Sequence, residues 1–575
     1  MGHKLDRVIY EISVVYIALP IFIFLAGWLR PAVAIPACII FLVSLFLLMK
    51  NHPAPISWHL TREKRLVVIV SIILLAVWVL FSGQGGFSFQ NADYQYRNAI
   101  FRDLIEKSWP VIYNYNPQNI PANSSIAGTS NLAVLTYYIA FWLPGALFGK
   151  LFGWYAGNAF LYFWSLLGIV LIVYYLFRTL RNTSVWSVVI LIFFSGLDIL
   201  GYVIISGKYP GPIDHIEWWS GFQYSSNTTL LFWVFNQTIT IWLAILLILN
   251  LKNTRSLFFL YAMLLLHGPF PFLGMLPIVL WKAYQGYPLT IPTEDTERKN
   301  PVFVFLLWFW NGVRRALSFE NVFGGISVLL IIYLYLSNNM SAGKTGTNNF
   351  SFNYCVFVFF EGGMYLLFLY VDHHRKPLYW ISLISLLLIP FFKVGSSQDF
   401  CMRVSIPALF MVQILIQQTL LGRQEQKQEQ KQEDKQEQKP GEMDELQDGT
   451  GPASVKPVVD GRHTLSSGER KIIRVIFIIL LVIGSVVPIQ EISRSVVFTL
   501  PAYEVTRSAM ISVGTALQDS GNPVLVPAGK SILKQSQYGI TWTDSVKTLD
   551  KSGTDLSNFM GPVKDSFFYE YLARR

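Results

Sequence analysis

Long apolar runs separated by short polar segments dominate the chain. A helix needs roughly 17 to 25 mostly apolar residues to cross a bilayer, because the hydrocarbon core is about 30 Å thick and each residue adds about 1.5 Å. The pattern predicts an all-α polytopic membrane protein with about thirteen transmembrane helices. The plain runs are residues 8–29, 32–49, 66–82, 158–177, 185–206, 229–250, 321–337, 351–371, 378–393, 404–421 and 472–489.

Three apolar stretches depart from a plain span. The motif HGPFPF at 267–272 sets two prolines beside a glycine, so we expect two shortened helices that meet at a break. Residues 132–153 contain Pro144, and counting them as a span would place the basic cluster RTLRN outside the cell. We therefore predict interfacial or re-entrant helices, both here and at residues 303–316, which contain two adjacent arginines.

Composition and charge support this interpretation. Of the 575 residues, 53% are hydrophobic and 14% are charged, whereas a soluble domain has about 25% charged residues. The net charge of +10 comes from short basic clusters near the ends of apolar runs, so it orients helices and does not indicate nucleic-acid binding. The basic start MGHKLDR places the N-terminus in the cytoplasm, and the loops 83–131 and 207–228 then lie outside.

The same pattern divides the chain into five parts. Residues 1–65 form an N-terminal transmembrane hairpin, and residues 66–422 form the transmembrane core. A repetitive Gln, Glu and Lys stretch makes residues 423–470 a disordered cytoplasmic linker. Residues 471–489 form the last transmembrane helix. We expect residues 490–575 to form a small extracytoplasmic domain of mixed α/β structure.

The first outer loop contains the strongest candidate for chemistry, in the run GGFSFQNADYQYRNAIFRDLIEK. Asp93 precedes a predicted helix and Arg97 follows one turn later, so the two side chains share a face. Such a carboxylate can accept a hydroxyl proton while the cation holds an anionic leaving group. Alternatively, Asp93 is an ordinary N-cap with an i,i+4 ion pair. Asp103 and Glu106 are expected on the solvated face of this helix.

This arrangement resembles the C-type (GT-C) integral-membrane glycosyltransferases. The resemblance rests on the acidic residue in an outer loop after an early span, the arginine one turn later, and the juxtamembrane segment LTYYIAFWLPGALFGKLFG followed by a span that ends in RTLRN. It implies a polytopic fold, a polyprenyl-phosphate-linked sugar as donor, and Asp93 as the catalytic residue that activates the acceptor hydroxyl. In this chain two spans precede the core, so the loop follows the third span.

Other outer residues are candidates for substrate contacts. The second outer loop holds Lys208, Asp214, His215 and Glu217 beside two tryptophans, an arrangement suited either to a sugar subsite or to an interfacial aromatic belt. Lys208 is assigned to the donor phosphate and the other three residues to substrate.

A third cluster, DFCMR, places Asp399 and Arg403 at i,i+4 spacing. Arg403 is assigned with Arg97 to the donor phosphate and Asp399 to substrate, the alternative being an interfacial ion pair. Glu361 lies inside an apolar run, where a carboxylate contacts substrate or bridges helices.

Together these features predict a membrane glycosyltransferase that transfers a sugar to an extracytoplasmic glycan or glycolipid by inverting displacement. The expected partners are the lipid-linked donor, the acceptor and membrane lipid, in a multi-pass protein of the bacterial cytoplasmic membrane with its active site and C-terminus outside. No cofactor is required by the pattern, although relatives of the resembled family include enzymes that use a divalent cation. The alternatives are a lipid-linked glycan transporter or flippase and an envelope polysaccharide polymerase.

Overall fold

The computed structural model describes most of the hydrophobic chain. The described residues are 2–51, 62–114, 132–211, 214–286, 310, 312–314, 316–340, 345–394, 399–422, 467–499, 504–523, 525–536, 548–549, 558–564 and 566–574. The predicted linker at 423–470 lies outside this set except for its last four residues, and the interfacial helix expected at 303–316 lies mostly outside it.

The described chain is mostly helical, which confirms the predicted class of an α-helical membrane protein. Seven of its helical stretches are long and apolar enough to cross a membrane. They are Leu5–Trp28, Pro31–Lys50, Glu63–Phe81, Trp154–Leu180, Val185–Ser206, Phe352–His373 and Gly468–Thr499. The total of about thirteen spans stays a prediction, because the other apolar helices in the described part are shorter.

The described residues between 2 and 286 form twelve α-helices. They are α1 (Gly2–Trp28), α2 (Pro31–Asn51), α3 (Arg62–Phe81), α4 (Tyr94–Glu106), α5 (Leu143–Phe152), α6 (Trp154–Leu180), α7 (Val185–Phe193), α8 (Asp198–Ser206), α9 (Asn227–Trp233), α10 (Phe235–Asn250), α11 (Leu257–Ala262) and α12 (Pro269–Gly286).

The second half continues with α15 (Ile326–Leu336), α16 (Phe352–Val358), α17 (Met364–His373), α18 (Pro377–Leu388), α19 (Asp399–Val404), α20 (Ile406–Leu421), α22 (Ser467–Gly484), α23 (Val486–Thr499), α24 (Glu504–Asp519) and α25 (Leu525–Ser536). The turns Glu320–Gly325, Phe359–Gly363 and Phe568–Leu572 are π-helical.

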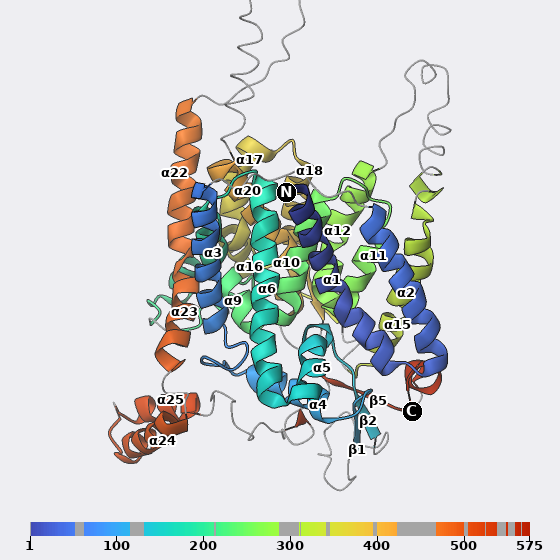
Figure 1. Cartoon of the computed structure of the whole chain (residues 1–575). Coiled ribbons are helices and arrows are strands. Elements are labelled where there is room, and N and C mark those ends of the chain that lie inside the picture. The colour runs from blue at the N-terminus through green and yellow to red at the C-terminus, as the bar shows by residue number, and fades with distance from the viewer. Residues whose placement is uncertain are drawn as a thin grey trace, which may run out of the picture.

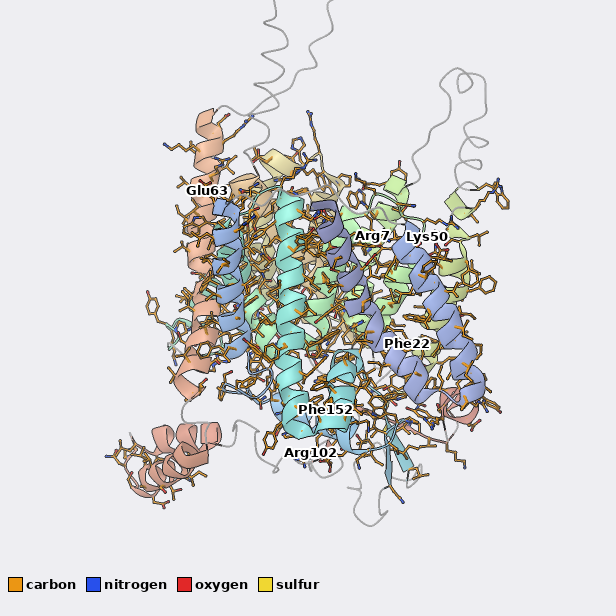
Figure 2. The ribbon with its side chains drawn as sticks, viewed as in Figure 1. Arg7, Phe22, Lys50, Glu63, Arg102 and Phe152 are labelled. Carbon is orange, nitrogen blue, oxygen red and sulfur yellow. The ribbon has the colours of Figure 1, made fainter. Side chains whose placement is uncertain are left out.

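The two ends of the bundle differ in structure (Figure 1). The N-terminus and the start of α22 lie at one end, whereas α4, α5 and the strands β1 (Ile112–Asn114), β2 (Leu132–Leu135) and β5 (Met560–Pro562) lie at the opposite end. In Figure 2 the labelled side chains of Arg7, Lys50 and Glu63 mark the first end, and those of Arg102 and Phe152 mark the second. We call these the N-terminal end and the loop end of the bundle.

A small antiparallel sheet closes part of the loop end. Its strands are β1 (Ile112–Asn114), β2 (Leu132–Leu135) and β5 (Met560–Pro562), in the order β1-β2-β5. The apolar run predicted as one interfacial helix over 132–153 therefore begins as a strand, and its helix α5 starts only at Leu143. The reason is pairing with distant segments, which satisfies the backbone groups of 132–135.

Residues near the end of the chain reach α1 and the sheet. The backbone N–H of Arg574 donates to the carbonyl of Trp28 at 2.8 Å. The backbone N–H of Arg30 donates to the carbonyl of Leu572 at 2.9 Å. Helices α24 and α25 pack against each other. The last predicted span, 471–489, is longer in the structure, because α23 carries the helical path on to Thr499.

Two predicted spans contain interruptions that matter for buried polar groups. The span at 185–206 is divided into α7 and α8 by residues 194–197. The backbone groups at this break find partners, since the N–H of Leu197 donates to the carbonyl of Phe360 at 3.1 Å and the carbonyl of Phe194 accepts from the N–H of Asn227 at 3.0 Å. As the prolines indicated, the chain also breaks before Pro269.

Candidate functional site

The chain leaves α3 through a tight glycine-rich turn that sets the position of Asp93. Gly83 has φ +84°, and a Cβ there would lie 2.8 Å from the carbonyl oxygen of Phe89, so the turn requires glycine. The turn is fixed to its surroundings by Gln90, whose amide donates to the Gly83 carbonyl at 2.8 Å, and by Asn91, whose amide donates to the carbonyl of Phe232 at 2.9 Å.

Asp93 and Arg97 form the expected ion pair at the start of α4. The distance from Arg97 Nη2 to Asp93 Oδ2 is 2.8 Å, and the side chains are 10% and 44% exposed respectively. Asp93 occupies the N-cap position of α4, but its side chain makes no capping hydrogen bond to the helix. The N-cap interpretation therefore does not explain why a carboxylate is present here. The carboxylate can therefore be reached from solvent, while the guanidinium lies beneath it.

Arg97 has donor capacity left over. Its guanidinium packs over the ring of Phe235, 5.1 Å from the centroid. Nη1 of Arg97 is buried and has no hydrogen-bond partner among the described residues. A buried donor without a partner costs about 1–3 kcal/mol, and an incoming anion would remove that cost.

Arg403 reaches the same region from α19. Its Nη2 lies 3.2 Å from Asp399 Oδ2, and its Nη1 donates to the hydroxyl of Tyr138 at 2.7 Å. The Tyr137 hydroxyl donates to the same Tyr138 oxygen. Nε of Arg403 is buried and, within the described part of the chain, has no partner. Arg403 thus repeats the arrangement of Arg97, with an exposed acid above it and a free buried N–H.

The Asp93–Arg97 and Asp399–Arg403 ion pairs interact electrostatically with each other and with Tyr137 and Tyr138. Burial would lower the pKa of Arg403, but Asp399, Tyr138, Tyr137 and the more distant Asp93 raise it above its ordinary value. The charge of Arg97 acts on both tyrosines, whose pKa values burial raises above the usual range. We refer to Asp93, Arg97, Tyr137, Tyr138, Asp399 and Arg403 as the arginine–tyrosine cluster.

The second outer loop makes a separate network. His215 Nδ1 lies 2.7 Å from Glu491 Oε1 on α23, and the same carboxylate pairs with Arg494 at 3.0 Å and accepts from Trp233 Nε1 at 2.9 Å. Burial favours neutral His215, yet the hydrogen bond and charge of Glu491 outweigh it and raise the pKa of His215 above 6.5. These contacts attach the loop to α23.

The remaining residues of that loop have local contacts. Glu217 is buried and accepts from the backbone N–H of Ser226 at 2.9 Å and from the Gln223 amide at 3.2 Å. Asp214 accepts from the N–H of Gly211 at 2.7 Å, and Lys208 lies exposed just after α8. The described contacts therefore give His215 and Glu217 structural partners, and the substrate roles assigned to this loop stay predictions.

Glu361 has a partner that the sequence analysis did not name. Its carboxyl lies near that of Asp198, at the break between α7 and α8, because both carboxyls contact the indole of Trp219. Trp219 Nε1 lies 3.3 Å from Asp198 Oδ1 and 3.4 Å from Glu361 Oε1. Both acids are buried, and two carboxylates this close together repel each other when both are ionised. The pair joins two broken helices, as the bridging alternative for Glu361 expected.

The expected position of Asp103 in the first outer loop was wrong. Asp103 does not lie on a solvated face: it is fully buried, and its Oδ2 accepts from the Tyr113 hydroxyl at 2.7 Å and from the N–H of Leu549 at 3.0 Å. The physical reason is that the sheet and the late segment around Leu549 cover this side of α4. Glu106 is exposed and pairs with Arg102 at 2.6 Å.

The length and composition of the helices define a multi-pass α-helical membrane protein. Comparisons with protein-family models, with curated proteins and with solved structures find no match. Within the described ranges, no group of three or more His, Cys, Asp or Glu side chains is arranged to hold a metal ion.

Proposed function

We propose that this protein is a membrane glycosyltransferase that takes a sugar from a polyprenyl-phosphate-linked donor and attaches it to a hydroxyl of an extracytoplasmic glycan or glycolipid. The observation that carries the proposal is the arginine–tyrosine cluster. It combines an accessible carboxylate, Asp93, with two buried guanidinium groups that each have a free N–H. This is the combination needed for proton removal beside an anionic leaving group.

In the proposed reaction the Asp93 carboxylate accepts the proton of the acceptor hydroxyl. The hydroxyl oxygen attacks the anomeric carbon and forms the new glycosidic bond. The bond from that carbon to the phosphate oxygen breaks, and the polyprenyl phosphate leaves with the electron pair. Arg97 and Arg403 stabilise the departing phosphate through their unused N–H groups. A single displacement of this kind inverts the anomeric configuration.

The outer position of the site is part of the proposal. The cluster is built from α4 and the segments just before α5 and α20, and α4 and α5 lie at the end of the bundle opposite the N-terminus (Figure 1). With the basic N-terminus in the cytoplasm, the cluster faces the outside of a bacterial cytoplasmic membrane. Asp399, which pairs with Arg403, is the best placed of the proposed substrate contacts.

Turnover of defined donors tests the proposal. Purified protein in lipid vesicles is incubated with a panel of polyprenyl-phosphate hexoses and pentoses and an extract of envelope glycans, and free polyprenyl phosphate is measured by mass spectrometry. Release with one donor, and incorporation of its sugar into the glycan fraction, supports the proposal. Absence of turnover with every donor, from protein whose folding is verified by circular dichroism, contradicts it.

The Asp198–Glu361 pair favours a second candidate, a transporter or flippase for a lipid-linked glycan. Paired buried carboxyls beside a broken helix are typical of proton-coupled carriers. Movement of a fluorescent polyprenyl-phosphate lipid between leaflets, abolished by Glu361→Gln and unaffected by Asp93→Asn, would support transport. Sugar transfer that survives Glu361→Gln and is lost in Asp93→Asn supports the transferase.

A further inference from the structure

An apolar groove lies on the surface of the bundle between α7, α20 and α22, away from the arginine–tyrosine cluster. It has a volume of about 560 Å³, within the range of roughly 300–1,000 Å³ typical of small-molecule sites. Its lining comes from α7, the end of α20, and α22, and includes Trp186, Phe193, Leu421, Ile478 and Val482. Several of these side chains are largely exposed, Trp186 at 66% and Val482 at 64%, as expected for groups that face lipid tails.

The groove has one charged end. Arg474 is the only ionisable side chain in its lining, and Ser485, which follows α22 directly, lies at the other end. The two residues are eleven positions apart, which corresponds to about 16 Å at 1.5 Å per residue. The groove is therefore a long apolar slot with a cation at its mouth.

The guanidinium of Arg474 is held in place and retains donors. Its Nε donates to the carbonyl of Thr419 at 3.3 Å, which orients the side chain at the end of α20. Arg470 is four residues earlier on α22 and so lies on nearly the same face. Glu469 is five residues earlier, about 140° round the helix. The mouth of the groove is thus positively charged.

The charged mouth of the groove lies at the N-terminal end of the bundle. Arg474 is in the second turn of α22, and α22 begins at the N-terminal end of the bundle (Figure 1). The segment 423–466 joins α20 to α22 and is composed mainly of Gln, Glu, Lys and other polar residues. Such a segment has few apolar side chains with which to fill the groove, which favours an apolar occupant from the membrane.

We propose that the groove binds an anionic glycerophospholipid, with one acyl chain in the slot between α7 and α22 and the phosphate against Arg474. The arrangement matches the two parts of such a lipid, an apolar chain and a headgroup that accepts hydrogen bonds from a guanidinium. The site is at the opposite end of the bundle from the arginine–tyrosine cluster. The proposal therefore does not depend on the proposed glycosyltransferase function.

The test uses Trp186 as a reporter. Full-length protein is reconstituted with phosphatidylglycerol or phosphatidylcholine brominated in the acyl chain, and the quenching lost in Trp186→Phe isolates the signal from the groove. We expect tighter binding of phosphatidylglycerol. Arg474→Gln should reduce that preference about fivefold, the factor that one basic residue near an anionic headgroup provides. Arg7→Gln removes an exposed arginine at the same end of the bundle and should leave the preference unchanged (Figure 2).

A second measurement tests the slot itself. Val482→Trp fills the groove, whereas Ile479→Trp places the same ring on an exposed part of α22 that does not line it. Quantitative mass spectrometry of copurified lipid should show loss of anionic phospholipid only in Val482→Trp. Equal binding of the two brominated lipids, an unchanged preference in Arg474→Gln, or the same lipid content in both tryptophan variants would each overturn the proposal.

Discussion

The hydroxyl of Tyr138 accepts a hydrogen bond from Nη1 of Arg403 at 2.7 Å, across 265 residues of sequence. This contact joins the segment before α5 to α19 and fixes the guanidinium of Arg403 within the arginine–tyrosine cluster. In the proposed reaction it is a positioning contact, since Tyr138 acts through Arg403. Its role differs from that of Asp93, which is proposed to touch the acceptor.

Asp93→Asn should reduce sugar transfer by about 10²–10⁴-fold, because an amide cannot accept the acceptor proton. Glu106→Gln is a matched control: Glu106 is on the same helix, is 45% exposed and pairs with an arginine one turn away. Initial rates of polyprenyl-phosphate release measure both variants. Full activity in a folded Asp93→Asn protein would remove Asp93 from the mechanism.

Tyr138→Phe should raise KM for the lipid donor more than it lowers kcat. The lost hydrogen bond to a charged group is worth about 1.5–3 kcal/mol, and Arg403 would then be less well oriented toward the phosphate. Tyr162→Phe, which removes a hydroxyl bonded to the Ala76 carbonyl at 3.2 Å, serves as the control. Steady-state kinetics over a range of donor concentrations distinguish the two parameters. Equal KM values in both variants would argue against positioning by Tyr138.

Gly196→Ala should destabilise the break between α7 and α8. A Cβ at Gly196 would lie 2.7 Å from Cδ and 2.9 Å from the backbone Cα of Glu361, so the helices must move apart, at a cost of about 1–3 kcal/mol. Gly312→Ala meets nothing within 4 Å and is the control. Thermal unfolding in detergent should show a lower midpoint only for Gly196→Ala. Identical midpoints would mean that this close approach is not rigid.

The His215–Glu491 contact should make stability depend on pH. Folding raises the pKa of His215 above 6.5, so its contribution is fully present below that value and is lost as the pH rises through the higher folded pKa. The groups that face His215 are Glu491 and Glu217, which favour the imidazolium, and Arg494, which opposes it.

Thermal midpoints measured from about pH 6 to about pH 9 should fall for the wild-type protein and change less for His215→Gln. His374→Gln is the control, because the His374 imidazole is half-buried and its described hydrogen bond is to the carbonyl of Tyr370, at 2.8 Å, with no acid beside it in the described contacts. A pH slope in His215→Gln as steep as that of the wild type would contradict the assignment.

Local relationships were predictable from the sequence. The lengths of the apolar runs predicted membrane helices such as α6, because the thickness of a bilayer fixes the length that a helix must have. The pairing of Asp93 with Arg97 followed from helix periodicity alone. The break before Pro269 followed from the inability of proline to continue a hydrogen-bonded helix.

Contacts between distant segments were not predictable in this way. Nothing in the sequence links Tyr138 to Arg403, or Ser82 to the Tyr94 hydroxyl that bonds its carbonyl. Asp198 did leave a signal, since an acid within a predicted span must find a partner or water. That rule selected Glu361 and should have selected Asp198 as well. The strand at 132–135 was missed because its pairing partner β5 is more than 400 residues later.

The pairing of β5 with β2 and the hydrogen bond between Arg574 and Trp28 also bear on biosynthesis. During translation α1 and β2 emerge long before their partners near residues 560–574. The loop end of the bundle therefore cannot acquire its finished surface until synthesis has passed these late residues. A ribosome stalled after α20 would leave a membrane-inserted chain whose β2 edge is unpaired, a form that quality-control proteases could distinguish from the completed protein.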